Sequence, residues 1–143
     1  MTFTINQTQH RSAIGLGIGW EGHEGTNVPR TDWPSQNIAW LDSSDGNFFS
    51  QILLFDGGSQ AEQEMPGVRA GGTYILKTRS EWLIEDKTWV DLKVWPLGSP
   101  EPAEWQLSAP VTTRDGSVLI IAHRIDVTIQ DIQIATIKLS DSP

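Results

Sequence analysis

The chain has 143 residues, of which 38% are hydrophobic and 20% charged, a balance typical of one soluble globular domain. Its 18 acidic and 10 basic side chains give a formal net charge of -8, which repels nucleic-acid backbones and anionic membrane surfaces, so neither is an expected partner. Because the chain has no cysteine, disulfides, thiolate metal sites and cysteine nucleophiles are excluded. We treat residues 1–143 as a single domain.

The first third of the chain predicts short strands separated by loops. Thr2–Asn6 alternates polar and apolar residues, and Ala13–Trp20 alternates glycine with isoleucine and leucine. A strand of the second kind carries side chains on one face only. Its bare face indicates close approach by another backbone or a large aromatic ring. A long loop is predicted for Glu21–Ser35, because glycine and proline recur along this range.

A polar turn follows between two predicted strands, Gln36–Leu41 and Asn47–Phe55. Oxygen-bearing residues in this turn have a superficial likeness to a calcium loop, and the weak candidate ligands are Asp42, Asp45 and Asn47. The closing glutamate of a calcium loop is missing, and Asp-Gly is the preferred dipeptide of a hairpin. The pattern therefore favours a plain turn over a metal site, and we expect no cofactor.

The middle of the chain predicts a strand pair after Gln60–Ala70, the only segment that could hold a short helical turn. Gly72–Trp82 and Thr88–Trp95 both alternate with period two. In the second strand, valine and leucine face one side, and Trp89 and Trp95 face the other. Pro96–Pro102 contains three prolines and predicts a rigid surface loop that leads to a short strand at residues 104–107.

The last third predicts two more strands. Ser117–Ala122 is a nearly continuous apolar run, typical of a buried strand. Asp126–Ile134 alternates with one change of phase at Gln130–Asp131, which requires a bulge if Ile132 and Ile134 are to keep the same face. About nine strands at intervals of roughly ten residues predict an all-β fold, an antiparallel β-sandwich.

A sequence motif spans the predicted strand and loop at residues 92–105. It reads Leu-Lys-Val-Trp-Pro-x-Gly-x-x-Glu-Pro-x-x-Trp, and this order resembles the C-terminal half of concanavalin A-like (laminin-G-like) jelly-roll domains. Such domains occur in phage structural proteins and in secreted carbohydrate-active proteins. The matching residues are Leu92, Lys93, Val94, Trp95, Pro96, Gly98, Glu101, Pro102 and Trp105. The resemblance covers residues 68–137 and implies a jelly-roll topology.

Catalytic patterns are missing from the sequence. The three histidines lack metal-binding spacing, and no serine lies in a Gly-x-Ser-x-Gly elbow. The Glu-x-Asp-x-x-Glu strand of jelly-roll glycosidases is absent too. We therefore predict that the protein is not an enzyme.

Tryptophan is the most informative residue type, with seven in the chain. Trp40, Trp95 and Trp105 are expected in the core. The four that border loops are the predicted contacts with a ligand or partner, namely Trp20, Trp33, Trp82 and Trp89. For Trp33, packing under its own loop is an equal alternative.

Two functions fit these patterns. In the first, the chain is a bacteriophage virion protein, a capsid decoration, fibre or tail-tip module, which binds other virion subunits as a homo-oligomer and takes host-surface glycan as a second ligand. In the second, it is a stand-alone lectin-like carbohydrate-binding module. An ordinary cytosolic binding domain is a third possibility. Residues 1–6 lack the pattern of a signal peptide, so we expect synthesis in the host cytoplasm and a final location in the virion.

Overall fold

The computed structural model describes residues 1–20, 37–44, 47–53, 59–84, 87–112 and 116–137, and every regular element in these ranges is a β-strand. The predicted all-β class is therefore confirmed for the described residues. The strands are β1 (Thr2–Trp20), β2 (Asn37–Ser44), β3 (Asn47–Leu53), β4 (Ser59–Glu64), β5 (Thr73–Ile84), β6 (Lys87–Pro96), β7 (Leu107–Thr112) and β8 (Ser117–Asp131). The helical turn expected within Gln60–Ala70 is wrong, because β4 lies there and pairs with β3.

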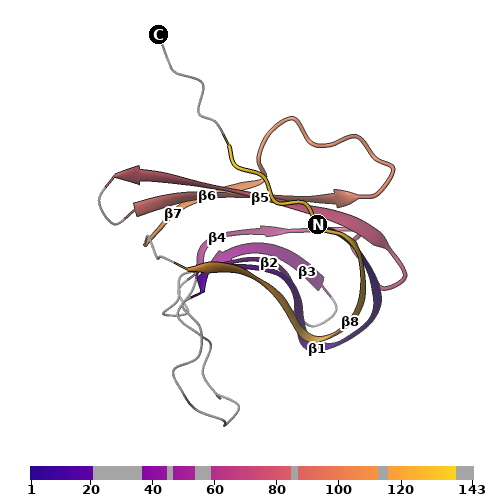
Figure 1. The fold of residues 1–143 in the computed structure, drawn as a ribbon. Coiled ribbons are helices and arrows are strands. Elements are labelled where there is room, and N and C mark those ends of the chain that lie inside the picture. Colours follow the sequence, from indigo (N-terminus) through magenta and orange to yellow (C-terminus); the bar gives the residue numbers. More distant parts are fainter. Residues whose placement is uncertain (21–36, 45–46, 54–58, 85–86, 113–115, 138–143) are drawn as a thin grey trace.

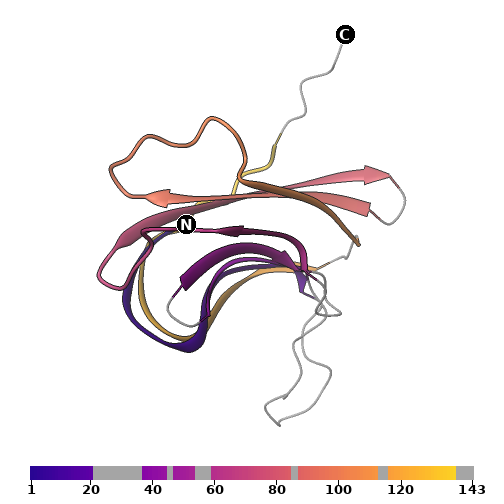
Figure 2. The same cartoon turned by 180° about the vertical axis from the view of Figure 1, so that it is seen from behind.

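Each pair of neighbouring strands is antiparallel, and all belong to one sheet. The order is β4-β3-β2-β1-β5-β6-β7, and β8 pairs with β1 outside this path. The sheet folds over on itself, so that β5, β6 and β7 form one layer and β1, β2, β3 and β8 form the facing layer (Figures 1 and 2). Because β4 and β7, the two ends of the order, contact each other, the sheet nearly closes into a barrel.

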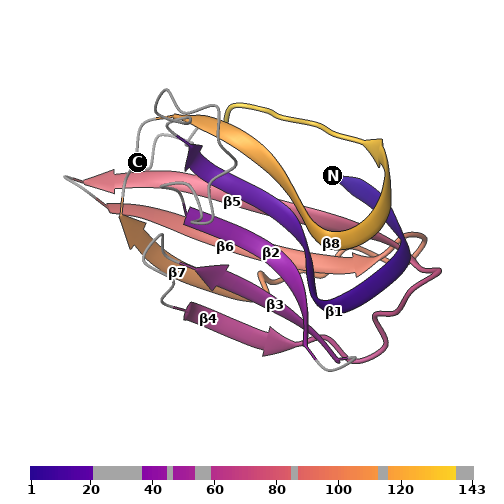
Figure 3. The same cartoon turned by 90° about the horizontal axis from the view of Figure 1, so that it is seen from below.

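The longest strands, β1 and β8, form a curved ribbon along one side of the molecule (Figure 3). Each replaces two strands that the sequence predicted separately. The ribbon bends where residues 9–12 of β1 lie opposite Arg124, and both Arg11 (φ 56°) and Arg124 (φ 49°) adopt left-handed backbone conformations there. A second irregularity leaves Gln130 as an extra residue between two paired positions, which confirms the predicted bulge.

The main core lies between the two layers. It combines one face of each strand, as expected for strands with one buried side. The largest fully buried apolar side chains are Phe3, Ile5, Ile14, Leu41, Ile52, Leu76, Leu92, Val90 and Val94. A smaller cluster of Ala13, Ile38, Trp40 and Ile121 lies on the other face of β1, β2 and β8.

Strand β5 starts beside β1 and then leaves it. Thr2 to Thr4 pair with the first residues of β5, and the pairing ends where Met1 and Leu76 exchange two bonds of 2.9 Å. Beyond Leu76, β5 stays paired with β6 as far as Ile84, but no described strand pairs with its other edge. The near-barrel therefore has an open side between β5 and the β1–β8 ribbon. No helix in the described part of the chain is long and apolar enough to cross a membrane.

Candidate functional site

Strand β6 presents charged and aromatic side chains on its outer face. Val90, Leu92 and Val94 point into the core, as predicted, so Asp91, Lys93 and their tryptophan neighbours point outward. Despite this orientation, Asp91, Lys93 and Trp95 are all less than 10% exposed, at 1%, 5% and 7%. They are covered because residues 97–106 rise from the end of β6 and return over this face to β7 (Figure 2).

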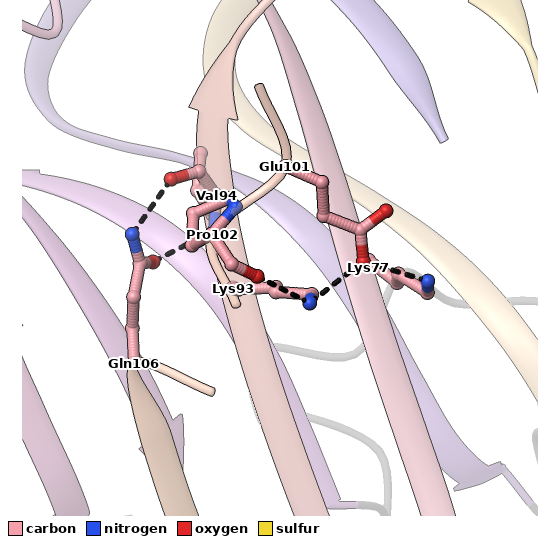
Figure 4. Close-up of polar contacts among 6 residues, drawn as sticks. All are labelled: Lys77, Lys93, Val94, Glu101, Pro102 and Gln106. Atoms are coloured by element: carbon pink, nitrogen blue, oxygen red, sulfur yellow. Dashed lines mark hydrogen bonds and ion pairs between the residues drawn. The ribbon is translucent and has the colours of Figure 1, made fainter. Parts of the chain in front are cut away.

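Lys93 ties this loop to the sheet (Figure 4). Its Nζ donates a hydrogen bond of 2.9 Å to the Pro102 carbonyl and lies 2.6 Å from the Glu101 carboxylate, which Lys77 also contacts at 2.8 Å. These hydrogen bonds from Lys77 and Lys93 lower the pKa of Glu101 below its ordinary value. The Lys93 ammonium also lies 4.6 Å from the centre of the Trp105 ring. It therefore contacts a carbonyl, a carboxylate and an aromatic ring of the same loop.

Gln106 fixes the other end of the loop. Its Oε1 accepts from the Val94 backbone N–H at 2.7 Å, and its Nε2 donates to the Val94 carbonyl at 2.9 Å (Figure 4). The side-chain amide thus takes the place of a strand residue beside β6. In these contacts, the Lys-Val-Trp-Pro-x-Gly-x-x-Glu-Pro motif holds the loop on the sheet.

A buried carboxylate organises the centre of the same face. Asp91 Oδ2 accepts from the Arg79 guanidinium at 2.7 Å (Nε) and 2.6 Å (Nη2). Its Oδ1 accepts from the Ser108 hydroxyl at 2.6 Å and from the Trp89 indole at 3.1 Å. Both carboxylate oxygens are therefore satisfied, as a buried charge requires. Sequence reasoning missed this cluster, although a charge on the same face as Trp89 and Trp95 was a visible signal.

A cavity of about 630 Å³ lies beside this cluster, between β5, the covering loop and the chain after β8. Its lining combines indole rings with charged groups. The residues that give it this character are Lys77, Arg79, Trp95, Glu101, Trp105 and Asp131.

A second cavity of about 560 Å³ occupies the open side of the near-barrel. Its walls come from β5, from the β1–β8 ribbon and from the segment that follows β8. The apolar lining residues are Leu16, Ile18, Trp82, Val118, Ile134 and Ile137. Four of the eight exposed large apolar side chains among the described residues line this groove, with Trp82 at 67% and Ile134 at 78% exposed.

The structure separates the four tryptophans predicted as contacts. Trp82 lies at the groove, and Trp89 is half-buried and bonded to Asp91. Trp20 is half-buried at the end of β1, opposite Ser117, and Trp33 lies outside the described residues. Of the tryptophans expected in the core, Trp40 (8% exposed) and Trp95 (7% exposed) are buried and Trp105 is half-buried.

Two of the three candidate ligands in the acidic turn, Asp42 and Asn47, lie in strands. Asp42 lies within β2, paired with Ala13 and Phe49, and Asn47 is the exposed first residue of β3. Asp45 lies outside the described residues. Burial and the nearby Glu62 raise the pKa of Asp42, against weaker opposing effects of the Ser43 backbone, His123 and Arg11. Among the described residues, no three His, Cys, Asp or Glu side chains come together as metal ligands.

The glycine-rich part of β1 has a specific neighbour. Gly15 pairs with Trp40, and a Cβ atom at position 15 would collide with the Trp40 Cβ and the Ala39 carbonyl. Of the two predicted neighbours of this bare face, another backbone or a large aromatic ring, the close approach of a backbone is confirmed at Gly15. The Trp40 indole then donates to Gln51 at 2.9 Å, and Gln51 donates to Glu62.

Comparisons with known proteins give no family for this chain. No protein-family model, curated protein or solved structure matches it.

Proposed function

We propose that the chain is a non-enzymatic structural protein of a bacteriophage virion, a capsid decoration, fibre or tail-tip module, which binds other virion subunits. The observation that supports this proposal is the apolar groove on the open side of the near-barrel. Large apolar side chains gathered in a groove are typical of a surface that another protein covers. The virion assignment itself rests on the sequence resemblance to phage jelly-roll proteins.

The proposal includes a jelly-roll topology. Two facing antiparallel layers and a nearly closed sheet are compatible with such a fold. The loop at residues 97–106 gives the resemblance a physical basis, because the matching residues Lys93, Glu101 and Pro102 contact one another there.

The test of this function is the location of the protein. Particles purified on a density gradient from lysates of the producing cells should contain the chain in constant proportion to the capsid protein, as measured by mass spectrometry. Detection only in the fractions free of particles would refute the virion role.

A lectin-like role is the second candidate, and the cavity of about 630 Å³ favours it. Indole rings beside charged and hydrogen-bonding groups are the usual lining of a glycan site. We expect a bacterial polysaccharide to change tryptophan fluorescence, and Trp105→Ala to abolish the change while Trp82→Ala, outside this cavity, preserves it. Equal responses of the two variants would argue against a glycan site here.

A further inference from the structure

The cavity of about 630 Å³ contains a carboxylate that the chain holds at one oxygen only. Glu101 Oε1 lies 2.8 Å from the Lys77 ammonium and 2.6 Å from the Lys93 ammonium. The second oxygen, Oε2, points away from both lysines (Figure 4) and makes no hydrogen bond or ion pair with the residues that the structure describes. Because two ammonium groups hold this carboxylate in place, Oε2 is a preorganised acceptor for a hydroxyl group of a ligand.

A donor lies beside this acceptor. Lys77 Nζ donates one hydrogen bond, to Glu101, and its side chain is 51% exposed, so its other N–H groups can reach a ligand. Both residues line the cavity. A hydroxyl group donates one hydrogen bond and also accepts. Two adjacent hydroxyl groups of a sugar therefore match the carboxylate and the ammonium group together.

The cavity also has a fixed aromatic surface. Trp105 lines it and is half-buried. The Arg79 guanidinium and the Lys93 ammonium lie 5.2 Å and 4.6 Å from the centre of its ring, so cations from two strands hold the indole over the sheet. A sugar ring can pack its apolar face on such an indole. The volume also fits a small ligand, since ligand pockets measure about 300 to 1,000 Å³.

The charges in the cavity disfavour an acidic sugar. The charged side chains that line it have formal charges that cancel, and they are Lys77, Arg79, Glu101 and Asp131. Both cations are already paired, Lys77 with Glu101 and Arg79 with the buried Asp91. Met1 lines the cavity too, and its amino group is attracted by Asp131. A carboxylate on the ligand would therefore compete for cations that are engaged, and it would be repelled by two carboxylates.

We propose that this cavity selects neutral sugars with adjacent hydroxyl groups over acidic sugars. One hydroxyl group donates to Glu101 Oε2, its neighbour accepts from Lys77 Nζ, and the sugar ring packs on Trp105. This inference rests on the lectin-like role proposed above and names the ligand class of that site.

The first experiment divides the bacterial polysaccharide by anion exchange into a neutral and an acidic fraction. Tryptophan fluorescence of the wild-type chain should change with the neutral fraction, and binding of the acidic fraction should be about tenfold weaker or less, because like charges meet in the cavity. Periodate oxidation followed by borohydride reduction cleaves adjacent hydroxyl pairs, so this treatment should abolish the response to the neutral fraction.

The outcomes separate this inference from the roles on which it depends. Equal or tighter binding of the acidic fraction, or binding that survives periodate, would overturn the inference and leave the lectin-like role standing. No response to either fraction would refute both. The particle test of the virion role is independent of all these results.

The second experiment removes the donor and the acceptor in turn, each with a matched control that lies outside the lining of the cavity. Lys77→Gln is compared with Lys87→Gln, at an exposed residue that begins β6. Glu101→Gln is compared with Glu104→Gln, at an exposed residue of the same loop. Loss of a hydrogen bond to a charged group should weaken binding of the neutral fraction about tenfold in the first variant of each pair, and the controls should bind as the wild type does.

Amide exchange in residues 97–106 distinguishes a lost ligand contact from a loosened loop. In Lys77→Gln, Lys93 still holds Glu101 and the Pro102 carbonyl, so exchange in the loop should stay as in the wild type while binding weakens. Equal binding by Lys77→Gln and Lys87→Gln, or a loss of binding only in variants whose loop exchanges faster, would overturn the assignment of the donor and the acceptor.

Discussion

The outer face of β5 and β6 and the open side next to β5 differ in the side chains that they carry. The outer face carries charged side chains, and the open side carries large apolar ones. On the outer face, the loop at residues 97–106 covers Asp91 and Lys93, and both of these charges have partners. On the open side, Trp82 and Ile134 remain exposed, and no described strand pairs with the adjoining edge of β5. The comparison teaches that the sequence motif marks a surface that the chain closes by itself, whereas the proposed partner surface carries no motif.

Asp91→Ala should have the largest effect on stability. It removes a buried acceptor from Arg79, Ser108 and Trp89, and each hydrogen bond to a charged group contributes about 1.5 kcal/mol or more. The free energy of unfolding is measured by urea titration followed by tryptophan fluorescence. Arg79→Lys serves as the matched control, because it keeps the charge and loses the paired geometry. A loss below about 1 kcal/mol for Asp91→Ala would mean that the outer face is not organised by this carboxylate.

Gln106→Ala should have an intermediate effect. The substitution removes both hydrogen bonds to the Val94 backbone, each of which contributes about 1 kcal/mol. Gln106→Glu is the informative companion, because it keeps an acceptor for the Val94 N–H but loses the donor to the carbonyl. Amide hydrogen exchange at Val94 should increase more in Gln106→Ala than in Gln106→Glu, and unchanged exchange in Gln106→Ala would contradict the role of Gln106 in fixing the loop.

Acid should loosen the covering loop before the rest of the fold. The pKa of Glu101 is lower in the folded protein than its ordinary value of 4.5. The contribution of Glu101 to stability is therefore fully present above the unfolded pKa. This contribution is lost as the pH falls below 4.5 and through the folded pKa. Fluorescence of the neighbouring Trp105 and amide exchange in residues 97–106 report this change. Glu101→Gln should remove the pH dependence from the loop, and its persistence in that variant would point to another group.

Trp82→Ala should have the smallest effect on stability, although it removes the largest type of side chain. The indole is 67% exposed, and truncation of an exposed side chain changes the free energy of unfolding by less than about 0.5 kcal/mol. The urea titration used for Asp91→Ala measures this change, and co-sedimentation of the variant with purified particles should weaken, because the indole lines the proposed partner groove. A stability loss comparable with that of Asp91→Ala would mean that Trp82 packs in the fold, and it would contradict the difference drawn between the two surfaces.

Period-two alternation was enough to predict most strands and the inward direction of Val90, Leu92 and Val94, because that signal is local. The phase change near Gln130 also correctly predicted a bulge. Local patterns could not predict that Thr2–Asn6 and Ala13–Trp20 belong to one strand, since the intervening Gln7 and Thr8 pair with the distant β8 and Ser12 pairs with β2. Strand β4 was missed for the same reason, because its polar sequence is extended by pairing with β3.

The candidate site was less predictable than the fold. Trp82 was expected at a contact surface and lies at the groove, but the loops that border Trp89 gave no sign of its bond to Asp91. That bond depends on two positions of β6 lying on one face under a covering loop. The position at which β5 parts from β1 could not be predicted either, because it follows from the register in which Thr2–Thr4 pair with Thr73–Ile75.

The β1–β8 ribbon sets the order of events in synthesis. Its pairs join residues as distant as Thr2 and Asp131, so the first strand waits for the last one to leave the ribosome. Until then β1 has only β2 and the start of β5 beside it, and one of its edges stays exposed to other nascent chains. Because most of its contacts join residues far apart in the sequence, we expect this topology to fold slowly.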